Sequence, residues 1–271
     1  MSAEMTIREH IEDLRTRILR IVIAIAVLTI FSMTFGFRPF EFNGVHFVFY
    51  YPYPDVFHNF AIQITSSMQS ALLPPGVKLI QTAPGQAFFA QMYVSMLIGM
   101  IGSMPIIIRE IYGFISPAFG EQTKRAGTSV FLPTICLFVA GIAFSYITVI
   151  PFALNFLYKY GQAIGVETFL NINDFISFVL QFFLAFGIAF ELPVIMYAIS
   201  LTGLIDAKFW RHNFRYAIII LVIFSAIITP DGSGITMWFV VVPMIVLYLV
   251  GIMTIMRKEK LRQALVNHVK N

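Results

Sequence analysis

The sequence predicts an all-α integral membrane protein with six transmembrane helices. Of its 271 residues, 58% are hydrophobic and 12% are charged, whereas a soluble domain is about 45–50% apolar and about 25% charged. The chain also contains six apolar stretches, most of them close to the roughly 20 residues that a helix needs to cross a bilayer core of about 30 Å. These observations predict one membrane domain over residues 1–271.

Proline and glycine mark the ends of the predicted spans. Pro151 is expected to end the third span, Thr202 and Gly203 the fourth, and Thr229 with Pro230 the fifth, because these residues interrupt helices. The predicted spans are 18–37, 87–108, 128–150, 175–201, 216–228 and 236–256.

Two segments depart from simple membrane helices. The segment 38–86 is rich in aromatic residues and proline, and we expect it to form a cap on the external face with a helix near 56–72. The fifth span has only 13 residues, about 20 Å of helix. It either stays short, or begins near Phe209 with Arg211 and Arg215 snorkelling to the membrane surface.

The distribution of Lys and Arg predicts the orientation. If both termini are cytoplasmic, 15 of the 18 Lys and Arg residues lie inside, and only Arg38, Lys78 and Lys159 lie outside. Cytoplasmic segments carry this excess of positive charge. The sequence therefore predicts a multi-pass protein of the cytoplasmic membrane with both termini in the cytoplasm. The basic residues act in topology, and no nucleic-acid partner is expected.

The motifs of several chemistries are absent. There is no HExxH, no GxGxxG and no GxxxxGK[ST] phosphate loop, and the "DGSGIT" stretch at 231–236 is not a GxSxG nucleophile elbow. The single cysteine, Cys136, cannot form an intrachain disulfide. The sequence predicts no enzyme, no cofactor and no metal site, so function must lie in binding and passage.

Glu191 is the one acidic residue deep in a predicted span. It lies in "FGIAFELPV" (186–194), between Gly187, which permits the close approach of another backbone, and Pro193, which is expected to kink the helix. Ionising an isolated carboxylate in hydrocarbon costs about a few kcal/mol or more, and acids within the membrane are functional by default. Either Glu191 faces a cavity or a partner helix, or it is a neutral hydrogen-bonding group between helices.

Other acids lie on the predicted cytoplasmic side. Glu12 and Asp13 precede the first span, Glu110 follows the second, and Glu121 lies in the next loop. Together they would form an acidic patch on a basic face. Carboxylates bind guanidinium groups in bidentate fashion, so a pair of arginines is a fitting ligand for such a patch.

Five collinear segments resemble the TatC family, the multispanning core of the twin-arginine protein translocase. "HIEDLRTRI" is similar to the family's H-L-x-E-L-R-x-R-L, and "FGIAFELPV" to its F-G-x-x-F-E-x-P. "MPIIIREIYGFISPAF" resembles the first cytoplasmic loop, "FSYITVIPFALNFL" the end of the third span, and "RYAIIILVIFSAIITPDGSG" the fifth span with its T-P-x-D turn. "TPDGSG" and "REIYGF" resemble archaeal members. The resemblance covers nearly the whole chain.

The resemblance implies a receptor for twin-arginine signal peptides, which are addresses read by a receptor. It implies recruitment of single-span TatA-type subunits, and TatB-type subunits where present, to export folded proteins with the proton motive force. Self-association and contact with the lipid bilayer are also expected. The implied fold is a concave, cup-like bundle of six helices in which the fifth and sixth are short.

Carried onto this chain, the resemblance implies a binding site for the arginine pair of the signal peptide. This site would consist of Asp13, Arg15, Phe114 and an acid of the first cytoplasmic loop. The family's loop glutamate would fall at Thr123, and its Tyr-Gln pair reads Arg109-Glu110 here, so that acid is either Glu121 or Glu110. Glu191, with Gly187 and Pro193, would be the intramembrane docking or gating position, and Asp231 the acid of an external turn. In the last span Leu249 stands where the family often has an acid.

A proton-coupled small-solute transporter with Glu191 as its coupling carboxyl is the alternative function. The missing internal repeat argues against it, because many transporters are built from two related halves.

Overall fold

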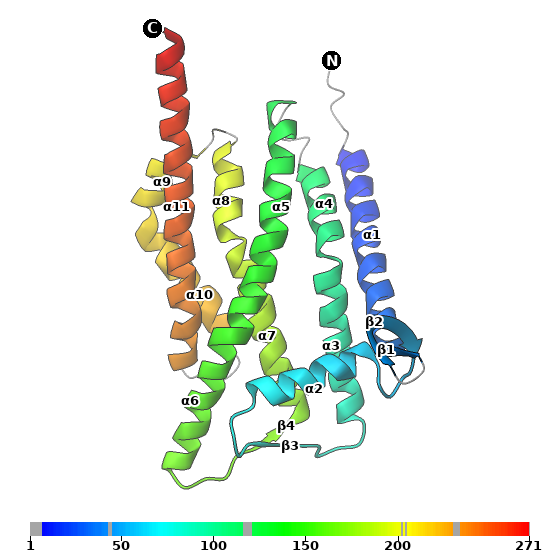
Figure 1. Cartoon of the computed structure of the whole chain (residues 1–271). Coiled ribbons are helices and arrows are strands. Elements are labelled where there is room, and N and C mark those ends of the chain that lie inside the picture. The colour runs from blue at the N-terminus through cyan, green and yellow to red at the C-terminus, as the bar shows by residue number, and fades with distance from the viewer. Residues whose placement is uncertain are drawn as a thin grey trace. The chain divides into compact units, whose positions relative to one another are not determined.

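The computed structural model describes residues 7–42, 45–115, 121–201, 203, 205–229 and 234–270. The described chain is mostly helical (Figure 1). It divides into two compact units, Met1–Phe114 with Leu154–Leu180, and Ile115–Ala153 with Gln181–Asn271.

In the first unit, α1 (Ile7–Thr34) packs along α3 (Gln86–Gly102), which is followed by α4 (Met104–Ile115). Small residues permit the close contact between α1 and α3. A Cβ atom on Gly99 would lie 2.7 Å from the carbonyl oxygen of Ile25, and the Ser32 hydroxyl donates a hydrogen bond of 3.4 Å to the Ser95 carbonyl. Small residues let helices in membranes approach closely.

The predicted cap contains strands as well as a helix. The expected helix is present as α2 (Phe60–Leu72), whose N-cap Asn59 accepts a 2.9 Å bond from the amide of Ile62. Before it, β1 (Phe35–Phe42) and β2 (Val45–Pro54) form an antiparallel hairpin that was not predicted. After it, β3 (Lys78–Ile80) pairs in parallel with β4 (Phe169–Asn171).

The second unit contains most of the remaining helices, and α11 packs against α8 and α10 within it. Gly251 makes room for α8, because a Cβ atom there would lie 2.8 Å from the sulfur of Met196.

The chain continues from α4 through α5 (Glu121–Phe144), the π-helical η2 (Ser145–Val149) and α6 (Ile150–Ala163), which crosses into the first unit. It continues through α7 (Ile172–Phe190), α8 (Leu192–Leu201), α9 (Ala207–His212), α10 (Phe214–Ile228) and α11 (Ile235–Lys270).

Pro151 does not end the third span, so that expectation is wrong. The candidate span runs over Phe131–Ala163. The π-helical turn over Ser145–Val149 explains this, because it lets the amide of Ile150 bond to the carbonyl of Ser145 just before the proline. Pro151 then lies in the first turn of α6, where its missing N–H and its fixed φ are tolerated.

Two other predicted spans are interrupted. The second is broken at Ser103 into α3 and α4, which meet at a bend of 54°, with Pro105 in the first turn of α4. The fourth begins at Ile172 and is interrupted at Glu191, two residues before Pro193, but continues to Leu201 as one candidate span. Proline near the start of a helix is allowed, whereas it disrupts the turn before it.

The fifth and sixth helices differ in length. α10 begins at Phe214, after a separate helical turn, α9, that ends at His212, so the fifth helix is short. α11 has 36 residues, so the expectation of a short sixth helix is wrong. Its polar end lacks the glycine or proline that would have stopped it. By length and composition, four described helices qualify as spans, or five with the bent pair, and α10 is a shorter apolar helix.

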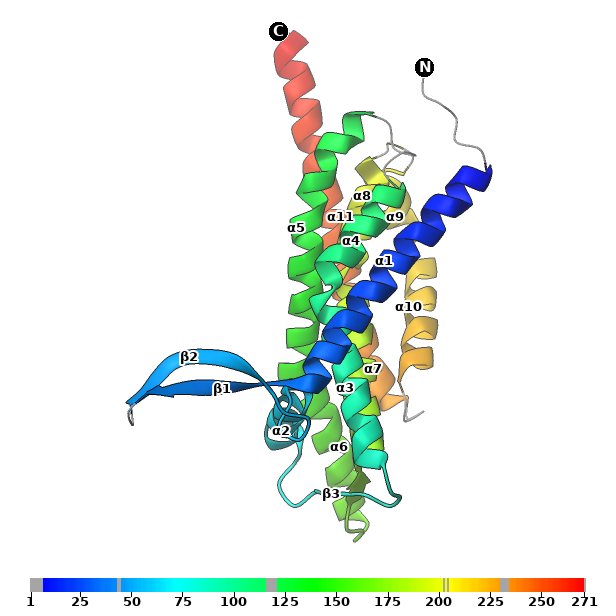
Figure 2. The same ribbon diagram turned by 90° about the vertical axis from the view of Figure 1, so that its right-hand side faces the viewer.

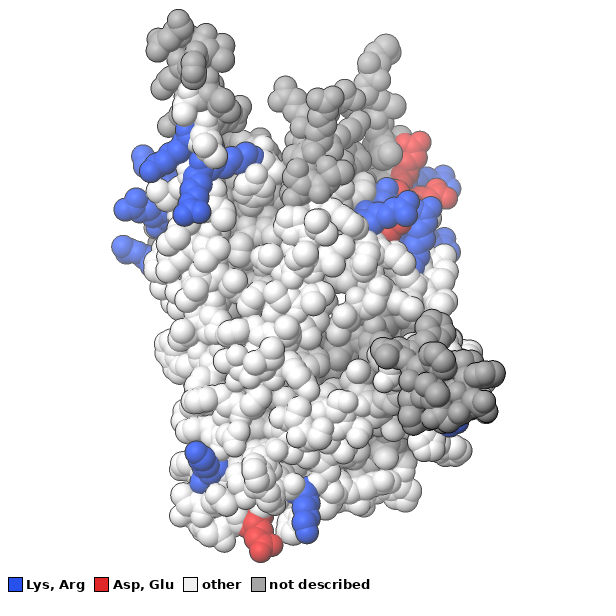
Figure 3. All heavy atoms as spheres, in the orientation of Figure 1, with Lys and Arg blue, Asp and Glu red and all other residues white. Residues whose placement is uncertain are grey.

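Charged side chains gather at the helix ends in each unit. In the first unit, Figure 3 shows basic and acidic side chains over the N-terminal end of α1 and the C-terminal end of α4. In the second, basic side chains lie toward the C-terminal end of α11. Between the charged ends, the visible face shows mainly side chains other than Lys, Arg, Asp and Glu, as a bilayer core requires.

Candidate functional site

Two predicted acids meet at the charged end of the first unit. Arg17 joins them: its Nε lies 2.8 Å from Oδ2 of Asp13, and its Nη1 lies 3.2 Å from Oε2 of Glu110. Arg20 approaches the same Glu110 oxygen at 3.5 Å. The side chain of Glu110 is only 7% exposed and that of Arg17 is 22% exposed. This acid–arginine cluster (Asp13, Arg17, Arg20 and Glu110) ties α1 to α4.

Helical spacing and one glycine explain the cluster. Asp13, Arg17 and Arg20 are separated by four and three residues, so they share one face of α1. One turn after Glu110 on α4, Gly113 leaves room for the guanidinium group, because a Cβ atom there would lie 3.2 Å from Cζ of Arg17. The cluster therefore depends on a small residue at 113.

Phe114 lies beside the start of α1. Its ring stacks on the ring of His10, with 4.5 Å between centroids and 24° between planes. Arg15 is exposed and makes no hydrogen bond or ion pair with any described residue. The structure thus brings together Asp13, Glu110 and Phe114, but not Arg15.

The remaining two predicted acids are not placed. α5 begins at Glu121, but the side chain of Glu121 lies outside the described part of the structure, and so does Asp231. Sequence reasoning missed Arg17 and Arg20 as partners of these acids. The spacing of Arg17 four residues after Asp13 was the available signal.

Glu191 occupies the interruption between α7 and α8 in the second unit, and the residue is 8% exposed. Thr134 of α5 makes a hydrogen bond to its carboxyl group. The other oxygen, Oε1, has no hydrogen-bond partner among the described residues. The backbone carbonyl of Glu191 accepts a 2.9 Å bond from Ile195, which carries the helix past Pro193. One buried acceptor of this carboxyl group is thus available for a further donor.

Gly187 and Gly141 set the contact between α5 and α7 in the same unit. A Cβ atom on Gly187 would lie 2.6 Å from the ring of Phe138. The close backbone approach is at Gly141, which faces the carbonyl group of Phe186. The space beside Gly187 is thus filled by a side chain of α5, one turn from Glu191.

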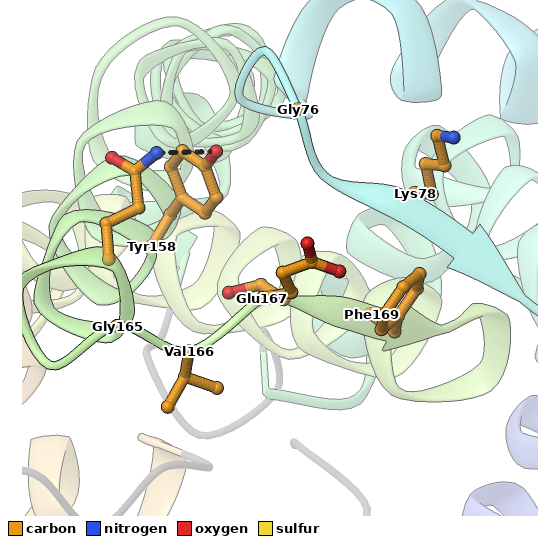
Figure 4. Close-up of a pocket in the computed structure, with 9 residues that line it drawn as sticks. Gly76, Lys78, Tyr158, Gly165, Val166, Glu167 and Phe169 are labelled. Atoms are coloured by element: carbon orange, nitrogen blue, oxygen red, sulfur yellow. Dashed lines mark hydrogen bonds between the residues drawn. The ribbon is translucent and has the colours of Figure 1, made fainter.

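A separate cavity of about 650 Å³ lies in the first unit between the start of β3 and the segment from α6 to β4 (Figure 4). Glu167 points into it, and Gln162 donates a 2.9 Å bond to the Tyr158 hydroxyl at its edge. Lys78 is its only basic lining residue. No predicted site residue lines this cavity, and no group of metal ligands occurs among the residues with described placement.

Apolar helices with charged ends, a guanidinium–carboxylate cluster between two helices and a carboxyl group within a candidate span define a membrane-spanning protein. The family model described as Sec-independent protein translocase protein (TatC) matches residues 9–243. The chain belongs to the TatC family. Members of this family are components of a protein translocase and are not enzymes.

Individual relatives agree with this assignment. The chain is 51% identical to the Sec-independent protein translocase protein TatC of Cenarchaeum symbiosum (strain A), over 95% of this chain and 97% of that protein. It is 31% identical to TatC of Aquifex aeolicus (strain VF5), over 92% and 93% of the two chains. A crystal structure titled twin arginine translocase receptor TatC matches with a TM-score of 0.72 and 29% identity, over 90% of this chain and 97% of that one. The predicted resemblance, including its archaeal character, is confirmed.

Proposed function

We propose that this protein is the signal-peptide receptor of a twin-arginine translocase, and that the acid–arginine cluster is its recognition site. The observation that carries the proposal is that Glu110, nearly buried between α1 and α4, already accepts two guanidinium groups. Two arginines of a signal peptide would present the same chemistry to the same carboxylates. The solved relative described as a twin arginine translocase receptor supports this function.

Recognition then proceeds by exchange. Arg17 holds Oδ2 of Asp13 and Oε2 of Glu110, so an incoming arginine must take over these bonds or use the other oxygen of each carboxylate. Each carboxylate offers about four acceptor sites, so two guanidinium groups can share one acid during the exchange. Phe114, stacked on His10, gives the neighbouring apolar part of the signal peptide a surface. Glu121 and Arg15 complete the proposed site.

We place this site on the cytoplasmic side of the cytoplasmic membrane, in a six-span chain with both termini inside and a cup-like arrangement of helices. Glu191 serves as the docking or gating group for a TatA-type or TatB-type single-span subunit, with Gly187 and Pro193 shaping its surroundings and Asp231 in an external turn. The unpartnered Oε1 of Glu191 supports this role, because a partner helix can supply the missing donor. Self-association and transport driven by the proton motive force complete the proposal.

Photocrosslinking in native membranes tests the recognition site. A photoreactive residue at Phe114 reports contact with a twin-arginine precursor. The Glu110→Ala, Glu121→Ala double variant is expected to lose most of the crosslink, because the guanidinium groups lose their carboxylates, and Asp13→Lys is expected to weaken it through repulsion. Glu12→Ala is the matched control, since Glu12 is an exposed acid of the same helix. Undiminished crosslinking in both altered proteins would refute the site.

Transport assays test Glu191 separately. Glu191→Gln keeps the shape of the side chain but replaces one acceptor oxygen with a donor group. We expect precursor crosslinking at Phe114 to persist while co-purification of the TatA-type subunit and export of a folded precursor decline. Thr134→Val removes the hydroxyl that bonds to Glu191 without removing the carboxyl group, and a smaller decline is expected. Loss of the first crosslink in a correctly folded Glu191→Gln protein would instead assign Glu191 to recognition.

A further inference from the structure

The β1–β2 hairpin differs in composition from the rest of the chain. Four of the eight residues of β1 and five of the ten residues of β2 are aromatic, whereas aromatic residues make up 15% of the whole sequence. Phe and Tyr are common in strands, but a hairpin that faces only water would not need this density of rings. The composition points to a surface that the hairpin contacts.

The register divides the base of the hairpin into two faces. Phe35 and Phe37 lie opposite Pro54 and Pro52, while Arg38 lies opposite Tyr51, and directly opposed residues share a face. The first face is supported by helices, since the ring centroid of Phe35 lies 5.0 Å from that of Phe31 in α1, and the centroid of Phe37 lies 5.2 Å from that of Phe60 in α2. Aromatic rings of the helices therefore support this face of the base, while on the other face Gly36 lies against the backbone of His58 and the side chain of Gln63 in α2.

The other face combines tyrosine rings with a cation. Cζ of Arg38 lies 4.6 Å from the ring centroid of Tyr53, and its Nη2 lies 2.7 Å from Oδ2 of Asp55. Tyr51 and Tyr53 are 37% and 41% exposed, whereas Tyr50, which lies opposite Pro39, belongs to the first face. A two-stranded hairpin is marginally stable in water. These exposed rings are the part of the hairpin that a further surface would stabilise.

The position of the hairpin identifies that surface. β1 starts at Phe35, directly after the candidate span that ends at Thr34. Figure 2 shows that both strands extend sideways from the end of α1, across the direction of α3, and do not continue along the helix axes. An element that leaves a spanning helix at its end and turns crosswise runs along the membrane surface. Continuity with the span thus favours lipid as the occupant.

We propose that the β1–β2 hairpin is an interfacial anchor that lies in the headgroup layer of the bilayer, at the end of α1. Tyrosine is enriched in this layer because its ring is apolar and its hydroxyl remains hydrated. Arg38 suits the same layer, because its stem can lie along apolar surface while its guanidinium group stays near headgroups and Asp55. The hairpin thereby holds the start of the cap, including α2, against the membrane.

Spin-label accessibility in the full-length protein tests this anchor. In a Cys136→Ser background, a nitroxide is attached to Tyr51→Cys or Tyr53→Cys, and the protein is placed in nanodiscs of phosphatidylcholine and phosphatidylglycerol. Collisions with oxygen, which concentrates in lipid, are compared with collisions with a water-soluble nickel chelate. Val27→Cys, on the lipid-exposed side of α1, and Ser66→Cys, on the exposed side of α2, provide the lipid and water references.

We expect the oxygen-to-nickel ratio at positions 51 and 53 to lie several-fold above the value at position 66 and below the value at position 27. The ratio should be the same in nanodiscs that hold one chain and in nanodiscs that hold several. A ratio equal to that of the Ser66→Cys reference would overturn the anchor. A rise that occurs only when several chains share a disc would also overturn it, because a second copy of the chain would then cover the hairpin.

Discussion

Without a signal peptide, Arg17 bonds to both acids of the proposed recognition site, Asp13 and Glu110. If a signal peptide must displace its hydrogen bonds, Arg17→Gln should tighten the binding of a twin-arginine peptide. The gain is expected to be about 1 kcal/mol, or about fivefold in Kd, since charge-assisted bonds are strong but this pair is partly exposed to solvent. Titration of a labelled signal peptide into the purified protein measures the change.

Arg20→Gln is the control for this prediction. Arg20 is 60% exposed and lies 3.5 Å from Glu110, so its removal should change Kd less. Weaker binding by a well-folded Arg17→Gln protein would show that Arg17 orients Glu110 for the ligand and does not compete with it.

Because of Asp55, the stability of the base of the hairpin is expected to depend on pH. Burial raises the pKa of Asp55, but hydrogen bonds from the backbone amides of Phe57 and His58 and from the His58 ring outweigh burial, so the pKa lies below its ordinary value. A carboxyl group whose folded pKa is lowered stabilises the fold above the unfolded pKa of about 3.9. This stabilisation is lost as the pH falls through the folded pKa.

Hydrogen exchange at the amides of Phe57 and His58 measures this loss. After correction for the intrinsic pH dependence, protection should fall when the pH drops below the ordinary carboxyl pKa. In Asp55→Asn the amide oxygen can still accept these bonds but does not titrate, so protection should not fall with pH. Equal protection at both pH values in the unaltered protein would contradict the prediction.

The contact between α5 and α7 depends on Gly141 more than on the predicted Gly187. Because Gly141 faces the backbone carbonyl of Phe186, a methyl group at position 141 would force the two helices apart, whereas the Phe138 ring beside Gly187 can turn. Gly141→Ala is expected to destabilise the protein by about 1–3 kcal/mol, the usual cost of overpacking. Thermal unfolding in detergent measures this loss of stability. Gly234→Ala is the control, since nothing lies within 4 Å of a Cβ atom at position 234. Equal unfolding temperatures of the two variants would disprove the dependence.

The lengths of the apolar stretches predicted most of the helices, because the thickness of the hydrocarbon core constrains the length of a spanning helix. The sequence signal for the breaks was weaker. Pro151 and Pro105 are both prolines in apolar runs, yet one is accommodated by a π-helical turn and the other follows a 54° bend, since the outcome depends on the preceding turn. The hairpin was missed although aromatic residues alternate with others in each half of "FGFRPFEF", which is a strand pattern interrupted at Pro39.

Tertiary contacts limited the prediction of the site. Asp13, Glu110 and Phe114 could be named from the resemblance, but their partners Arg17 and His10 required knowledge of which face of α1 meets α4. The same holds for Glu191, whose bond to Thr134 joins residues more than 50 positions apart. Helical periodicity identifies faces, whereas packing decides which faces meet.

Across the whole molecule, the predicted topology depends on the distribution of charge and on the length of α10. In the first unit, the start of α1 and the end of α4 lie at one end, where Arg17 meets Glu110. In the second, the amide of Ala207 bonds to Glu259 of α11, so the start of α9 lies beside the C-terminal part of α11. Each pairing joins segments that the Lys and Arg distribution places in the cytoplasm.

α10 is the helix on which the six-span prediction depends. Its 15 residues cover about 22 Å, less than the thickness of the hydrocarbon core. Its outer side is nevertheless strongly apolar, with Ile219, Ile220, Ile223 and Ile227 each more than half exposed. Exposed isoleucines of this kind are stable in lipid and costly in water. We therefore expect α10 to cross the membrane, with thinning of the bilayer beside it.

Single cysteines in a Cys136→Ser background test this crossing. In sealed vesicles with the external face outward, a membrane-impermeant maleimide should label Ser66→Cys and Gly234→Cys directly. It should label Asn213→Cys and Asn267→Cys only after the vesicles are opened, because positions 213 and 234 flank α10 on opposite sides. If positions 213 and 234 are labelled from the same side, α10 does not cross, and the chain has an odd number of spans with its termini on opposite sides of the membrane.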